Sequence, residues 1–219
     1  MSSQLLFRLI SLFGLLGIVA AIVWAIRSQL IQFAGTKQTL RQQSLDMATN
    51  LRQWRALSTP ARLDALMRFF YLATLAGVLI LAITGFVPVI FGYHAANFAL
   101  MIHMILAPLF AIGITALALF HAERHRFNQN DWQRLRQWFR REKSAAPREN
   151  PELWQKLCFW LSVLLSVPIL VSILLIMYPI FDTRAQETFL HWHGYAGLLL
   201  LAIVVLHAYL ILSNKRIEH

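Results

Sequence analysis

The sequence predicts an all-α membrane protein with a four-helix transmembrane core and one extra transmembrane helix at its N-terminus. The first observation is composition: of 219 residues, 58% are hydrophobic and 14% are charged. An ordinary globular domain has roughly 45–50% apolar and about 25% charged residues. The second observation is that the apolar residues form five long stretches, and about 20 apolar residues suffice for a helix to cross a bilayer. A soluble enzyme is therefore excluded.

The five expected spans cover approximately 5–26, 69–92, 98–120, 157–181 and 188–212. The first span resembles the apolar region of a signal peptide, but it is longer, and its basic residue Arg27 follows it. We interpret residues 1–33 as a retained N-terminal transmembrane anchor.

The net charge of +10 would favour nucleic acid as a partner in a soluble chain. Here the Lys and Arg residues lie almost entirely between the apolar stretches, so the expected partner is membrane lipid and not nucleic acid. Residues 123–156 alone hold nine Lys or Arg and five Asp or Glu. Because basic loops stay on the cytoplasmic side, both polar segments are assigned there, with the N-terminus outside and the C-terminus inside a bacterial cytoplasmic (inner) membrane.

The polar segment 34–66 is expected to connect the anchor to a core over residues 67–219, whose basic cytoplasmic loop is 123–156. Within the connector, the stretch TLRQQSLDMATNLRQWRALS places leucines and a tryptophan among basic residues. This pattern suits an amphipathic helix on the inner membrane surface, and a solvated connector is the alternative.

Chemistry-bearing residues are few. The single cysteine, Cys158, excludes a disulfide framework, a cysteine-ligated iron–sulfur cluster and covalent haem attachment through C-x-x-C-H. Any redox centre must therefore use histidine, and of the eight histidines, His103 and His207 lie well inside apolar stretches. Ionisable residues inside membrane helices are functional candidates by default.

The spacing of four histidines predicts two stacked metal sites. His103 and His193 each lie about five residues into spans that run in the same direction, so they reach the same depth. His193 and His207 are 14 residues apart on one helix, which corresponds to a rise of about 21 Å. Their side chains point in directions within about 40° of each other around the helix axis. His103 and His121 are 18 residues, or about 27 Å, apart on one face.

Two tiers of histidine on two helices suit two b-type haems, each held by two imidazoles without covalent attachment. The outer tier, His103 with His193, matches well in depth. The inner tier, His121 with His207, does not match fully, because His121 is expected to lie roughly 6 Å deeper. His125 is a reserve ligand.

Small residues support the outer tier. Ala107 follows His103 by four residues and Gly197 follows His193 by four, which leaves the adjacent turn low enough for a flat macrocycle. Close helix packing is the alternative explanation, since small residues commonly serve it in membranes.

The last span, HGYAGLLLLAIVVLH from His193 to His207, resembles the cytochrome b subunit of membrane-bound formate dehydrogenase and related di-haem quinone-linked b-type cytochromes. The likeness covers about residues 67–213. In that family, the second core helix supplies one haem ligand, the fourth two, the third none and the first one. His103, His193 and His207 match these positions.

The first core helix departs from the family because it contains no histidine. The family's ligand position falls near Tyr71. The missing ligand is His121, or it is Tyr71 or another group, or the inner haem is absent or five-coordinate. Two haem b groups are thus expected, with one as the alternative.

The resemblance implies a membrane-integral cytochrome that carries electrons between an outer-face redox partner and the quinone pool. It would be the quinone-reactive subunit of a respiratory oxidoreductase complex, with quinone or quinol as exchangeable substrate. Its expected partners are an iron–sulfur or c-type cytochrome subunit and a catalytic subunit. The alternatives are a non-redox membrane anchor or assembly subunit, and a small transporter that uses the histidines as a proton relay.

Overall fold

The computed structural model describes residues 3–29, 58–91, 98–140, 151–178 and 180–214. These residues form helices, in the order α1 (Ser3–Gln29), α3 (Thr59–Phe91), α4 (Phe98–His121), α5 (Gln129–Phe139), α6 (Pro151–Met177) and α7 (Thr183–Asn214). No strand occurs among them, so the predicted all-α class is confirmed. The amphipathic stretch predicted inside the connector lies outside the described residues.

Five of the helices are long and apolar enough to cross a membrane, as predicted. Their apolar spans are Leu5–Val23, Ala61–Phe91, Phe98–His121, Glu152–Met177 and Thr183–Ile211. Large apolar side chains stay exposed along them, for example Leu164 and Ile112 at 65% and 61% exposure. In water such surface would be costly, so the chain is a multi-pass membrane protein whose natural surroundings are lipid.

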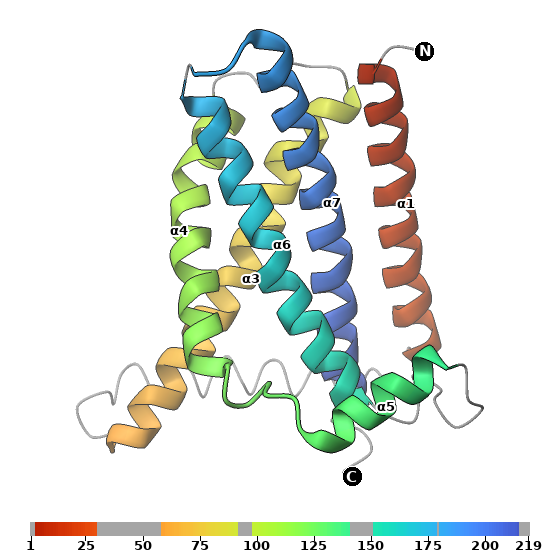
Figure 1. The fold of residues 1–219 in the computed structure, drawn as a ribbon, viewed down its shortest axis with the longest axis vertical. Helices are drawn as coiled ribbons and strands as arrows, with labels where there is room; N and C mark the ends of the chain where they lie inside the picture. The colour runs from red at the N-terminus through yellow and green to blue at the C-terminus, as the bar shows by residue number, and fades with distance from the viewer. Residues whose placement is uncertain (1–2, 30–57, 92–97, 141–150, 179, 215–219) are drawn as a thin grey trace.

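The membrane-spanning helices run along the long axis of the molecule, and α5 lies across one end (Figure 1). The most extensive packing joins α6 to α7 and α3 to α4, and contacts of α3 with α7 and of α4 with α6 close the ring. The four helices therefore follow the cyclic order α3, α4, α6, α7, and α4 lies diagonally opposite α7. Side chains that point inward from α4 and α7 meet in the middle of the bundle.

The two ends of the bundle differ in charge, and we name them accordingly. The basic end is where α4 connects through residues 122–128 and α5 to α6, and it carries most of the described Lys and Arg residues. The neutral end is where α6 connects to α7 through residues 178–182, and α1 begins there (Figure 1). Each membrane helix thus has one terminus at the neutral end and one at the basic end.

α1 packs outside this ring, against α7 and α3. The contacts use glycines: a Cβ atom on Gly194 would collide with Phe7, and one on Gly14 would lie 2.7 Å from Leu198. Small residues permit such close approach of helices in a membrane. The four-helix core with one extra N-terminal helix is therefore confirmed.

Three helices, α3, α6 and α7, begin at least five residues before the apolar stretches predict. α3 begins at Thr59, ten residues before the expected span, because its polar first turns are still good helix formers and Arg68 pairs with Asp64 one turn away at 2.6 Å. α7 begins at Thr183, where the Asp182 carboxylate accepts a hydrogen bond from Ala185 N. Hydropathy locates the lipid-facing part of a helix and not its polar ends.

Candidate functional site

At the neutral end, the structure brings His103 of α4 and His193 of α7 together across the bundle. Their ring centroids lie 6.2 Å apart with an interplanar angle of 64°. An imidazole nitrogen lies about 2.0 Å from a bound metal ion, so two imidazoles on opposite sides of one ion have centroids roughly 6 Å apart. The separation therefore fits a shared metal.

Hydrogen bonds fix the tautomer of His103. Nδ1 of His103 lies 3.0 Å from Thr84 Oγ1 on α3. The Thr84 hydroxyl donates its only proton to Ile80 O at 2.8 Å, so toward His103 it accepts. Nδ1 of His103 therefore carries the proton, and its Nε2 keeps a free lone pair.

His193 is held in the same way from α6. Its Nδ1 lies 3.1 Å from Ile169 O and 3.2 Å from Ser172 Oγ, and the Ser172 hydroxyl itself donates to Ile169 O. A carbonyl can only accept, so Nδ1 of His193 donates and Nε2 is free. A neutral imidazole whose second nitrogen donates to a fixed oxygen is the usual arrangement of a metal-binding histidine.

The sequence-based reasoning did not identify these supporting residues. Thr84 and Ser172 sit among apolar neighbours, where a hydroxyl is noticeable, but only packing shows which histidine each one meets. Gly85 was also missed: a Cβ atom there would lie 3.2 Å from Cε1 of His103, so the glycine lets α3 approach the ring closely.

At the basic end, His207 of α7 is buried, at 8% exposure. Its ring lies 6.2 Å from that of His125, with an interplanar angle of 49°. Nδ1 of His207 is buried. A second imidazole pair of the same separation thus lies at the opposite end of the bundle, about 21 Å along α7 from the first.

His125 is held by the turn that follows α4 and by α6. Its Nδ1 donates to His121 O at 3.1 Å, its ring stacks on Phe159 at 4.1 Å and 19°, and its carbonyl accepts from Trp160 Nε1 at 2.9 Å. Burial lowers the pKa of His125 below its ordinary value, so the ring is neutral at pH 7.

His121, predicted from the spacing to pair with His207, ends α4 next to this pair. Its ring lies 6.1 Å from that of His125 and 6.4 Å from that of Phe159, but within the described residues it makes no ring contact with His207. Its Nδ1 is buried without a hydrogen bond to a described residue. Tyr71, the other candidate, is half-buried on α3, and its ring contacts none of the described histidines. The assignment of His121 stays a prediction.

The two predicted small residues lie one turn from the neutral-end histidines. A Cβ atom on Gly197 would meet only Phe86, at an ordinary 3.8 Å, so tight helix packing does not explain this glycine. Ala107 is half-buried on α4. His191, only two residues from His193, points instead toward α1, where its ring lies 5.3 Å from that of Phe7.

α5 covers the basic end as an amphipathic helix. Asn128 and Asp131 form a capping box, with hydrogen bonds of 2.8 and 2.9 Å between each side chain and the other's backbone N–H. The Lys156 ammonium of α6 lies 2.7 Å from the Asp131 carboxylate, and both side chains are largely buried. Burial alone would raise the pKa of Asp131, but the hydrogen bonds from Asn128 and Lys156 lower it below its ordinary value. The pair anchors α5 to α6.

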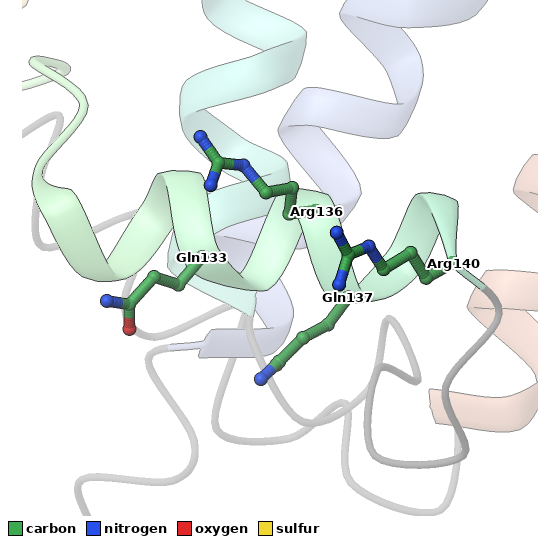
Figure 2. A pocket seen from close by; sticks show the side chains of 4 residues that line it. All are labelled: Gln133, Arg136, Gln137 and Arg140. Carbon is green, nitrogen blue, oxygen red and sulfur yellow. The ribbon is translucent and has the colours of Figure 1, made fainter.

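A shallow depression lies on α5, lined by Gln133, Arg136, Gln137 and Arg140. Figure 2 shows these side chains on successive turns, with the two glutamines extending to the opposite side of the ribbon from Arg136. Trp132 and Phe139 are exposed on the same helix, at 59% and 73%. Exposed aromatic and basic residues together are typical of a helix that lies in a membrane interface.

Residues 62–219, more than half of the chain, match the family model for prokaryotic cytochrome b561. The chain belongs to the prokaryotic cytochrome b561 family. No curated protein and no solved structure matches it significantly. The expected membership among membrane b-type cytochromes is confirmed at this level, and α1 lies outside the matched region.

Family membership makes this chain a membrane-bound b-type cytochrome of transmembrane electron transfer, with haem b as its cofactor. The residues at the neutral end fit that cofactor, because His103 and His193 face each other with Nε2 free and Nδ1 hydrogen-bonded. Within the described residues, no three His, Cys, Asp or Glu side chains converge on one point. Haem b takes only two protein ligands, which a pair of imidazoles supplies.

Proposed function

We propose that this cytochrome carries electrons across the bacterial cytoplasmic membrane between a redox partner at the neutral end and the quinone pool at the basic end. The observation that supports this most is the placement of two imidazole pairs at opposite ends of one bundle, with His193 and His207 on the same helix. A scaffold without a redox role has no need of paired neutral imidazoles with matched spacing.

Haem b supplies a one-electron Fe(III)/Fe(II) couple when bound. At the neutral end His103 and His193 hold the iron, while Thr84, Ser172 and Ile169 O keep both rings in the tautomer that binds metal. Phe86, buried at 7% exposure, and the surrounding apolar side chains exclude water. The small side chain of Ala107 and the absence of one at Gly197 leave room beside each ligand for the flat macrocycle. At the basic end His207 is a ligand.

The orientation follows from charge. Lys and Arg gather at the basic end, which we assign to the cytoplasm, so that the N-terminus is outside and the C-terminus inside. Exchangeable quinone or quinol binds near the basic end, and the partners are an iron–sulfur or c-type cytochrome subunit and a catalytic subunit. The single cysteine supports the need for such partners, because this chain has no cysteine set for an iron–sulfur relay.

The test is reconstitution of the purified, full-length protein into vesicles that enclose ferricyanide and contain no other redox protein. External reduced quinone analogue should reduce enclosed ferricyanide, and the rate should fall to that of empty vesicles in His193→Ala. His191→Ala is the matched control, because it removes an imidazole of the same helix that faces α1. Protein that binds haem b but gives the rate of empty vesicles would contradict the proposal.

A further inference from the structure

His207 needs a second ligand if an iron is to be bound at the basic end, and the first core helix offers no histidine. The described residues of α3 contain none, and the ring of Tyr71 contacts none of the described histidines. A second ligand must therefore come from the residues that face His207 across the bundle.

We propose that His125 and His207 are the two protein ligands of a second haem b at the basic end, so that a turn residue replaces the ligand of the first core helix. This inference rests on the proposed function, in which His207 is a ligand. The inference goes beyond the proposed function because it names the second ligand of this haem. It also excludes α3 and His121 as sources of that ligand.

The two histidine pairs have the same ring separation. The centroids of His125 and His207 are separated by the same 6.2 Å as those of His103 and His193. Both pairs join the α4 side of the bundle to α7, which lies diagonally opposite. The ring of His121 has no such contact with His207 within the described residues, although its own helix carries it to the same end.

The hydrogen bond of the His125 ring leaves one of its two nitrogens free. His125 donates its Nδ1 proton to His121 O, and this leaves Nε2 with its lone pair. The equivalent bonds at the neutral end leave Nε2 of His103 and His193 free as well.

Contacts with α6 hold His125 in place although it lies outside a helix. The Phe159 ring stacks on it and the Trp160 indole binds its carbonyl, so α6 fixes both the ring and the backbone. A solvated turn histidine requires neither contact. Positioning of this kind is what a metal ligand on a turn requires, because the helix no longer sets its direction.

The experiment compares His125→Ala with His121→Ala in the full-length protein purified in detergent. Haem b is counted per chain, and the ferric form is examined by low-temperature electron paramagnetic resonance. We expect wild type to hold about two low-spin haems, each with two axial imidazoles. His125→Ala should lose about one of them or turn it high-spin, and added imidazole should restore the low-spin signal. His121→Ala should keep both low-spin signals.

A second pair of variants controls for the possibility that the alanine variants misfold. His125→Met keeps a side chain that can bind iron, and methionine in place of histidine raises the reduction potential of a haem. One of the two midpoint potentials should rise in His125→Met, whereas His121→Met should leave both unchanged.

The outcomes separate this inference from the proposed function. If the alanine variant of His121 loses the haem and that of His125 keeps it, His121 is the ligand; the inference fails and the proposed function stands. If wild type holds one haem that His207→Ala and His125→Ala both leave intact, the basic-end site does not exist and both fail. Unchanged potentials in His125→Met would also overturn the inference.

Discussion

The neutral end and the basic end hold their imidazole pairs by different means. At the neutral end both histidines project from long membrane helices, and hydroxyl and carbonyl oxygens of α3 and α6 receive their Nδ1 protons. At the basic end one ring comes from a helix and the other from a turn, held by an aromatic stack and a tryptophan. At the neutral end, neighbouring helices position both ligands through hydroxyl and carbonyl oxygens, whereas at the basic end α6 side chains fix a turn.

The hydroxyls of the neutral end show how this is done without leaving unpaired polar atoms. Thr84 and Ser172 donate to carbonyls of their own helices and accept from the histidines, so each hydroxyl is satisfied twice. At the basic end the polar ends of the spans carry charged pairs instead: Arg68 pairs with Asp64 on α3, and Lys156 of α6 pairs with the buried Asp131 of α5.

The largest effect is expected from His193→Ala, which removes one ligand of the neutral-end pair. The protein should lose about half of its haem, because only the basic-end pair remains complete. The pyridine haemochrome assay on purified protein measures this. His191→Ala, which alters an imidazole directed at Phe7, should keep the full haem content; equal losses in both variants would show that haem content reports folding and not ligation.

Next in size is Asp131→Asn, which tests the polar anchor of the basic end. Removing one charge of a buried pair leaves Lys156 uncompensated, and we expect a loss of about 3 kcal/mol in the free energy of unfolding. Denaturant titration in detergent measures it. Asp131→Asn combined with Lys156→Met should recover most of the loss, and a double variant as unstable as the single one would argue against the ion pair.

The same carboxylate predicts a pH dependence. The pKa of Asp131 is lowered in the folded protein, so its stabilisation is complete above its ordinary value of about 4 and is lost as pH falls through the lowered one. The stability difference between wild type and Asp131→Asn should therefore be constant from pH 8 to about 5 and shrink below about 4. A difference that grows on acidification would contradict this sign.

A smaller effect is expected from Thr84→Val, which removes the oxygen that receives the His103 proton. Loss of such a supporting bond commonly costs about tenfold or more in metal affinity. Haem transfer to an excess of apomyoglobin should be roughly tenfold faster than in wild type. Ser172→Ala should have less effect, because Ile169 O still accepts from His193, so the reverse order would show that the oxygens do not act in this way.

The smallest effect is expected from Gly85→Ala. The new methyl group would lie 3.2 Å from Cε1 of His103 and must shift that ring by a few tenths of an ångström. The low-spin resonance of the neutral-end haem should change. Gly77→Ala is the matched control on the same helix, because a Cβ atom there meets nothing within 4 Å. Equal spectra for both variants would mean that Gly85 does not constrain His103.

The sequence alone predicts the membrane class, the five spans and the proximity of His103 to His193. Hydropathy decides which residues face lipid, and the 3.6-residue period of a helix decides which residues share a face. These are local rules, so they need no knowledge of neighbouring helices. They failed at the polar ends of α3 and α7, where pairing and capping extend a helix past its apolar stretch.

The ring that meets His207 and the oxygens that receive the histidine protons become visible only in the packed bundle. The spacing argument treats α4 as a straight helix and places His121 opposite His207, but the chain turns after His121, and α6 fixes His125 through Phe159 and Trp160. Thr84 and Ser172 meet the histidines from helices that are distant in sequence. Contacts of this kind depend on helix tilt and on which helices are neighbours, and no single-helix pattern contains that information.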